Sequence, residues 1–173
     1  MRVQRLFSRC RARVKLADFL GMLRLALWKA AYARLVRSSF ATVPFYREHW
    51  ALCGRTDPIL VSGKEGVNGG AVPAEILAER LGDLVPLRGG PGAVEPLRDK
   101  GPGVLTDELL GVLARRRDCG HWHVDWTTAY VRSTPAGLAF SLLRQRSPRL
   151  VDVLPAGGLP GAVGWCHGPV LLT

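Results

Sequence analysis

Cys119-Gly120-His121-Trp122-His123-Val124-Asp125-Trp126 is the stretch at which the apolar pattern of this 173-residue chain becomes that of a β-strand. From Trp122 onward, apolar side chains occupy every second position and alternate with polar ones, which is the period of a strand with one buried face. Two further apolar runs follow over residues 137–143 and 150–154. The turn-forming residues 133–137 lead into the first of these runs and predict a β-hairpin.

The beginning of the chain is predicted to be helical. Within residues 1–50, apolar residues recur at intervals of three and four, as on one face of an α-helix. That face consists of Leu16, Phe19, Leu20, Leu23, Leu27 and Ala30, and the pattern continues through Tyr32, Leu35 and Val36. Pro44 is expected to end the helix or to begin a short second one, because proline lacks an amide N–H and disfavours helical backbone in the residue before it.

Turn residues divide the remainder of the chain. Residues 51–103 are expected to form a turn-rich linker with a short strand over residues 58–62 and one helix over residues 73–84. Residues 104–173 are expected to form a strand-rich C-terminal region.

One more helix is expected at the start of that region, over residues 104–117. Thr106 can act as its N-cap, and the carboxylates of Asp107 and Glu108 would lie in the first turn, where the helix dipole favours negative charge. Together the segments predict an α/β fold with a basic helical N-terminus followed by a mixed or antiparallel sheet.

Positive charge is concentrated in the first quarter of the chain. Residues 1–47 contain 11 Lys and Arg and one acidic residue, whereas residues 48–173 contain 13 of each sign, so the whole net charge of +10 lies before residue 48. Such asymmetry indicates an anionic partner, and we expect nucleic acid or anionic lipid to bind through residues 2–37. The alternative is a solvated helix face without a partner.

Composition and hydropathy narrow the class of protein. Apolar residues make up 47% of the chain, which is enough for a hydrophobic core and argues against wholesale disorder. No stretch reaches the roughly 18 apolar residues of a membrane span, and no cleavable signal sequence is recognisable. We therefore expect no transmembrane segment and a cytoplasmic location.

Thiols and imidazoles provide candidate metal ligands in two short groups. The candidates are Cys119, His121, His123, Cys166 and His167. Zinc favours tetrahedral sets of thiolate and imidazole, and two ligand pairs from separate loops are a common arrangement. In a strand, His121 and His123 would face the same side and could reach one ion. The sequence thus predicts a zinc site and, as one interpretation, a small zinc-stabilised interaction domain; the alternative is a set of cysteines and histidines without a metal.

Several motifs are shared with a known enzyme group. Leu35-Val36-Arg37 leads through a basic helix into Val43-Pro44-Phe45-Tyr46-Arg47, and residues 59–65 follow as a short strand and turn. Thr106-Asp107-Glu108 and Trp165-Cys166-His167-Gly168-Pro169 lie further along the chain. These segments resemble the adenylate-forming ligases of the phenylacetate–CoA ligase and coenzyme F390 synthetase group.

The resemblance implies an internally shortened adenylate-forming domain related to ATP-dependent carboxylate–CoA ligases. Asp107 or Glu108 would correspond to the acid of the family's threonine motif, and Asp152 to the carboxylate that holds the ribose of ATP or AMP, provided that a nucleotide pocket survives. The family's phosphate loop has no counterpart, because residues 89–92 contain glycines but neither hydroxyls nor lysine, and the lid domain with its catalytic lysine has no counterpart either. The chain is therefore interpreted as a degenerate, accessory or non-catalytic relative that works with a partner enzyme or carrier protein.

Overall fold

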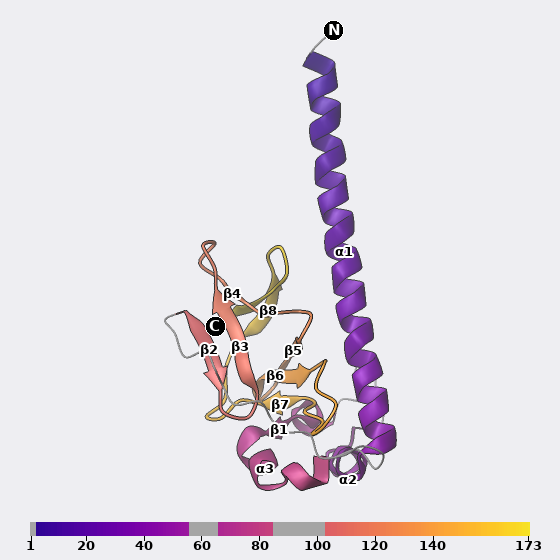
Figure 1. The fold of residues 1–173 in the computed structure, drawn as a ribbon, viewed down its shortest axis with the longest axis vertical. Coiled ribbons are helices and arrows are strands. Elements are labelled where there is room, and N and C mark those ends of the chain that lie inside the picture. Colours follow the sequence, from indigo (N-terminus) through magenta and orange to yellow (C-terminus); the bar gives the residue numbers. More distant parts are fainter. Residues whose placement is uncertain (1–2, 56–65, 85–102) are drawn as a thin grey trace.

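A long N-terminal helix stands beside two small β-sheets in the computed structural model (Figure 1). The structure describes residues 3–55, 66–84 and 103–173, with side chains from Phe19 onward. The strand expected over residues 58–62 lies outside the described residues, as do the segments 59–65 and 89–92 that entered the family comparison.

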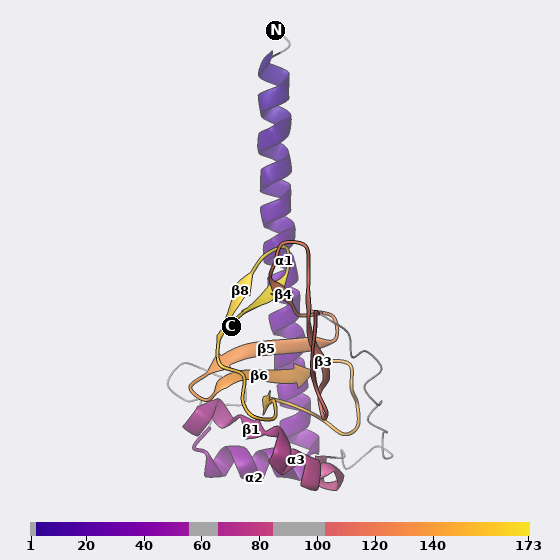
Figure 2. The same ribbon diagram turned by 90° about the vertical axis from the view of Figure 1, so that its left-hand side faces the viewer.

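The two N-terminal helices meet at Pro44, as the sequence predicts. Helix α1 (Val3–Thr42) is 40 residues long, and its N-terminal part projects well beyond the sheets (Figures 1 and 2). Helix α2 (Pro44–Leu52) follows after Val43, whose φ of −116° and ψ of 104° are those of extended backbone. Pro44 therefore ends one helix and begins the next, because the residue before a proline avoids helical backbone.

Helix α1 packs on the sheets through its aromatic face. Trp28, Tyr32, Leu35 and Val36 are buried, and Trp28 Nε1 donates a hydrogen bond of 2.8 Å to the carbonyl oxygen of Ala129. The leucine-rich face that the sequence pattern groups together is exposed instead at Phe19, Leu20, Leu23 and Leu27. Phe19, Leu23 and Leu27 recur every four residues on the side of the helix away from Trp28 and Tyr32, so the sheets do not cover them. No helix in the described part of the chain is long and apolar enough to cross a membrane.

The expected helix over residues 73–84 is shorter than predicted. Three short elements, namely η1 (Val67–Gly70), α3 (Ala74–Glu79) and η2 (Leu81–Leu84), follow α2 in the described residues. Arg80 leaves helical backbone with φ −120° and ψ 24°. Gly82 lies just beyond this break, and glycine weakens a helix because it has the most backbone entropy to lose. The single apolar pattern is thus divided into an α-helix and a 3-10 turn.

The described strands form a 4-stranded sheet and a 5-stranded sheet. The first has the order β1 (Val72–Pro73), β7 (Val153–Leu154), β6 (Gly137–Leu142) and β5 (Ala129–Thr134). The second has the order β2 (Val104–Asp107), β3 (Gly111–Arg116), β4 (Trp122–His123), β9 (Pro169–Leu172) and β8 (Ala162–Trp165). β1 and β7 run parallel, and the other described pairs are antiparallel. The α/β class with a mixed or antiparallel sheet is therefore confirmed.

The helix predicted over residues 104–117 is wrong, because this segment forms the β2–β3 hairpin. The Oδ1 atom of Asp107 accepts hydrogen bonds from the backbone N–H groups of Leu109 and Leu110, each 2.9 Å long. Asp107 thus closes a tight turn, and Gly111, with φ 79°, leads out of it. Aspartate caps turns and helices by the same kind of hydrogen bond, so the local pattern did not distinguish between them.

The β5–β6 hairpin lies where the sequence predicts it. The two strands pair from Ala129 with Leu142 to Thr134 with Gly137. Gly137 has φ 120°, and a Cβ atom at this position would lie 2.8 Å from the carbonyl oxygen of Leu159. The turn therefore requires glycine both for its backbone conformation and for this close approach. In the last predicted run, only residues 153–154 form a strand among the described residues.

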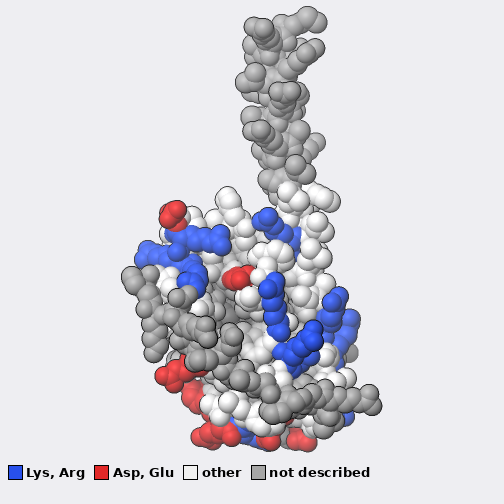
Figure 3. Space-filling view, in the orientation of Figure 1, with Lys and Arg blue, Asp and Glu red and all other residues white. Residues whose placement is uncertain are grey.

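Charged side chains are unevenly distributed over the surface. On the face shown in Figure 3, most of the visible Asp and Glu side chains gather at the end of the molecule formed by α2 and α3. Lys and Arg lie over the β3–β4 region and along the side on which α1 packs. Positive and negative side chains are therefore partly separated on this face.

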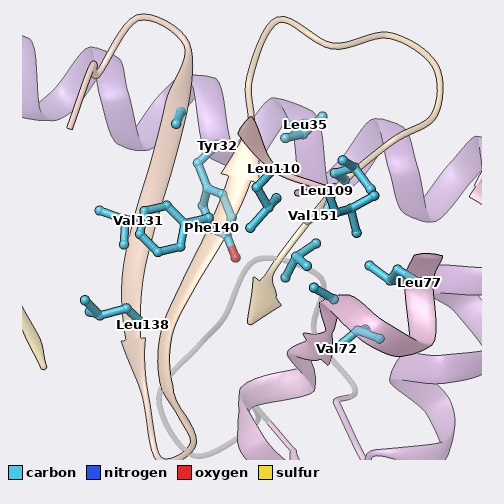
Figure 4. Packing of buried hydrophobic residues seen from close by; sticks show 14 of the residues in the cluster. Tyr32, Leu35, Val72, Leu77, Leu109, Leu110, Val131, Leu138, Phe140 and Val151 are labelled. Carbon is cyan, nitrogen blue, oxygen red and sulfur yellow. The ribbon is translucent and has the colours of Figure 1, made fainter. Parts of the chain in front are cut away.

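The hydrophobic core combines residues from all three predicted segments. Tyr32 and Leu35 of α1 lie near Phe140 of β6 and Val151, while Leu77 of α3 enters from below (Figure 4). All five belong to one buried cluster. The segments 1–50, 51–103 and 104–173 consequently fold as parts of a common core.

A fully buried carboxylate lies at the centre of this packing. Asp152 has no exposed surface, and its oxygens accept hydrogen bonds from Tyr32 Oη at 2.8 and 2.9 Å and from Ser141 Oγ at 3.3 Å. The guanidinium groups of Arg55 and Arg132 form ion pairs with it at 2.7 and 2.9 Å. Burial alone would raise the pKa of this carboxyl, but the positive charges of Arg132 and Arg55 and the Tyr32 hydroxyl hold it below its usual value.

The substitution Asp152→Asn is expected to lower the free energy of unfolding by about 3–5 kcal/mol at neutral pH, because it removes the buried negative charge that pairs with Arg55 and Arg132. Denaturant unfolding measures this change. The lowered pKa means that the stabilisation is complete above the ordinary aspartate pKa of about 3.9 and is lost as the pH falls through the folded-state value. The difference between the two proteins should therefore shrink in acid. The control Asp83→Asn removes an exposed carboxylate paired with Arg80 and should cost at most about 1 kcal/mol.

Candidate metal centre

Two hairpin turns of the second sheet carry the candidate ligands. In the β3–β4 turn, the N–H of Gly120 donates to the carbonyl oxygen of Arg117 at 2.8 Å, and Gly120 has φ 81°. In the β8–β9 turn, the N–H of Cys166 donates to the carbonyl oxygen of Gly168 at 2.8 Å, with His167 between them at φ 54°. Both turns lie at the same end of the molecule, the end from which α1 projects (Figures 1 and 2).

The two turns bring three ligand atoms together. One ligand atom from each of Cys119, His121 and Cys166 lies within 4.8 Å of the other two. Zn–S bonds of about 2.3 Å and Zn–N bonds of about 2.0–2.1 Å give ligand separations of roughly 3.3–3.8 Å in a tetrahedral site. Small side-chain movements would therefore close the group around one ion. These three residues lie close enough together to bind a metal.

The two remaining candidates lie directly beside this group. Cys119 Sγ is 3.0 Å from Nε2 of His123, and Cys166 Sγ is 3.6 Å from Nδ1 of His167. All five residues that the sequence singles out therefore lie near one another, although they come from two turns far apart in the chain. Thiolate and neutral imidazole are the ligand types that zinc prefers.

His121 and His123 lie in different environments. His121 is exposed and precedes β4, whereas His123 is buried within it. Val124, the next residue, is also buried, so the alternation that the sequence suggests ends after two strand residues. His121 consequently meets the thiols from the solvent side and His123 from the protein side. This gives a bound ion one face toward the protein and one toward water.

Charge and burial keep the imidazole of His123 neutral. Burial lowers its pKa, and the electrostatic influence of Arg117 and of the neighbouring imidazoles lowers it further. The pKa of the Cys166 thiol is raised by desolvation and by the nearby Cys119 thiol. A neutral imidazole is ready to bind a cation, whereas a thiol must lose its proton, which the charge of the metal itself promotes.

A nucleophile, base and orienting acid made of Cys119, His121 and Asp125 is a second interpretation of the same stretch. Asp125 instead holds its own turn: its Oδ1 accepts hydrogen bonds from the N–H of Thr127 at 2.9 Å and from the hydroxyl of Thr127 at 2.7 Å. The imidazole in contact with the Cys119 thiol is that of His123. Two thiols and the imidazole of His121 lie close to one another, and His123 lies beside Cys119, which suits a cation better than a catalytic triad.

The carboxylates assigned to a nucleotide by family resemblance lie apart from this centre. Asp107 is buried, and its second oxygen accepts a hydrogen bond of 2.8 Å from the N–H of Ala156. Glu108 is exposed on the β2–β3 turn. Asp152 belongs to the buried network in the core. Asp107 and Asp152 are thus parts of two separate hydrogen-bond networks.

The sequence did not reveal two features near the centre. One is Arg117, whose charge lowers the pKa of His123. The other is an open groove of about 570 Å³ between α1 and the β8–β9 turn. Its lining includes Leu20, Met22, Arg24, Leu25, Trp165 and His167. Residues from two ends of the chain form it, so no local pattern could have indicated it.

Comparison with known proteins yields no relative: no protein-family model, curated protein or solved structure matches this chain.

The metal-free protein is expected to lose stability as the pH falls through about 6.5, the ordinary pKa of histidine. Burial lowers the folded-state pKa of both His123 and His49. The unfolded chain therefore binds protons at a higher pH than the folded chain does, and acidification favours unfolding. Urea unfolding in the presence of a chelator, repeated across this pH range, measures the effect. His123→Gln and His49→Gln should each reduce the slope; an unchanged slope in both variants would contradict this assignment.

Proposed function

We propose that this protein is a small zinc-stabilised interaction domain in which one zinc ion joins the β3–β4 turn to the β8–β9 turn. The observation that carries the proposal is the mutual approach of Cys119, His121 and Cys166 within 4.8 Å. Two thiols and an imidazole are soft and borderline ligands, which favour zinc over magnesium or calcium.

His123 is the proposed fourth ligand. Its Nε2 atom already lies 3.0 Å from the Cys119 sulfur, and burial and the charge of Arg117 lower the pKa of its imidazole, which favours the neutral form that binds zinc. With His123, the set is two cysteines and two histidines, a common composition of structural zinc sites. His167, beside Cys166, is positioned to take that place if His123 stays within the core.

A structural role fits the weakness of the sheet at this point. β4 consists of two residues, and it connects β3 to β9 through two paired positions on each side. So short a strand contributes few hydrogen bonds, and the exposed turns around Cys119 add little packing. An ion bound across the turns would hold β3, β4, β9 and β8 in register. Zinc binding of this kind contributes directly to the free energy of folding.

The full-length chain, expressed with zinc and purified without chelator, is expected to contain one zinc per molecule. Cys166→Ser and Cys119→Ser should each abolish stoichiometric zinc, because a hydroxyl is a poor zinc ligand. Removing zinc with a chelator should lower the melting temperature by at least about 10 °C, and added zinc should restore it. Metal analysis and thermal unfolding measure the two effects on the same sample.

Cys53→Ser is the matched control. Cys53 also lies beside a histidine, with 3.5 Å between its sulfur and Nε2 of His49, but this pair lies on and just after α2, and Cys53 does not belong to the candidate group. The variant should keep its zinc and its chelator response. Absence of zinc from the unsubstituted chain, or equal zinc content in Cys119→Ser and Cys53→Ser, would overturn the proposal.

A further inference from the structure

Helix α1 carries a dense group of exposed apolar side chains. Phe19, Leu20, Met22, Leu23 and Leu27 have exposed fractions of 57%, 43%, 64%, 45% and 52%. They lie within a little more than two turns of one helix. Single exposed leucines are ordinary on a protein surface, but a contiguous apolar group of this size marks an interaction site.

Part of this group faces away from the sheets, whereas Leu20 and Met22 line the groove beside the β8–β9 turn. At 3.6 residues per turn, Phe19, Leu23 and Leu27 lie on one side of the helix, while Trp28 and Tyr32 lie on the side buried against the sheets. The apolar side is therefore available along the helix without displacing the sheets. Figures 1 and 2 both show the N-terminal part of α1 standing clear of the remaining elements.

Positive charge surrounds the apolar group. Arg24, Lys29, Arg34 and Arg37 are exposed on the same helix, and no acidic residue occurs from Phe19 to Arg47. Residues 1–47 hold the entire net charge of the chain. A partner must therefore offer both negative charge and an apolar medium. Long basic side chains can extend their charged ends toward water while their methylene groups lie along an apolar surface.

We propose that α1 docks on an anionic lipid bilayer, lying along the headgroup boundary with Phe19, Leu23 and Leu27 inserted toward the acyl chains. Helices that combine exposed apolar side chains with Lys and Arg bind membranes at the headgroup boundary, and the affinity combines buried apolar area with attraction to anionic headgroups. The two sheets then lie on the aqueous side of the helix. This interaction does not depend on the zinc site.

Nucleic acid and a second copy of the chain each match only one of the two properties of this surface. A nucleic acid would neutralise the basic side chains but leave the exposed Phe19, Leu23 and Leu27 in water. A second copy of the chain would cover these side chains but bring together two segments that each carry a net charge of +10. A bilayer containing anionic lipid matches both the charge and the apolar group.

The test is flotation of the full-length protein with vesicles of phosphatidylcholine alone and of phosphatidylcholine mixed with phosphatidylglycerol. The protein should float with the anionic vesicles and remain unbound with the neutral ones. Added salt should weaken binding, because it screens the attraction between the helix and the headgroups. Arg24→Gln combined with Lys29→Gln should likewise weaken binding to the anionic vesicles.

Leu23→Glu combined with Leu27→Glu should lower the partition coefficient at least about tenfold, because each leucine withdrawn from the acyl region forfeits the free energy of its burial. Both side chains are exposed, so the fold should be retained, which circular dichroism and the melting temperature verify. Ile76→Glu is the matched control: Ile76 is 49% exposed on α3, and its substitution should leave vesicle binding unchanged.

Three results would overturn the proposal. The first is an absence of binding to anionic vesicles, or equal binding to both vesicle types. The second is binding to duplex DNA or RNA that survives Leu23→Glu and Leu27→Glu while vesicle binding is absent, which would assign α1 to nucleic acid. The third is a stable dimer, seen by sedimentation in the absence of lipid, that these two substitutions convert to a monomer.

Discussion

The buried carboxylate of Asp152 is the interaction on which the rest of the structure depends. It binds Tyr32 of α1, Arg55 after α2, Arg132 of β5 and Ser141 of β6, so helices and first sheet meet at one charged group. A fully buried carboxylate is compatible with a stable fold only when it is paired, because an unpaired buried charge would lower the stability of the folded state by several kcal/mol. The network therefore favours a single arrangement of α1 on the sheet. Loss of any one partner should weaken the interactions that the remaining partners make with Asp152.

Local features of the fold were predictable where a single residue determines the backbone conformation. Pro44 separates two helices, and the turn that ends at Gly137 makes a hairpin, because both depend on the backbone conformations that these two residues allow. The segment over residues 104–117 was misread as a helix, since the turn that Asp107 caps resembles the start of a helix in sequence. Tyr32, Leu35 and Val36 continue the predicted helix face and are buried, whereas the burial of Trp28 was not predictable, because it depends on where the sheets pack against the helix.

The candidate site also contains features that the sequence predicted and features that it did not. Two ligand pairs with short spacing were visible in the sequence, and the structure brings Cys119, His121 and Cys166 within reach of one ion. The partners of Asp152 were not visible, because Arg55 and Tyr32 lie 97 and 120 residues before it in the chain. The resemblance to adenylate-forming ligases stays a prediction. Of its three assigned carboxylates, two are engaged inside the protein, and Glu108 lies exposed on a turn.

The positions of the two ligand-bearing turns have a topological consequence. β5, β6 and β7 all lie in the chain between Cys119 and Cys166, although they belong to the first sheet and the turns belong to the second. An ion bound across the turns would therefore close a loop that contains three of the four strands of the other sheet. Closing that loop lowers the conformational entropy of the unfolded chain in the segment that contains β5, β6 and β7. In the folded protein, β7 pairs with β1 and α1 packs against β5. A metal on the surface of one sheet would in this way favour assembly of the buried sheet that it does not touch.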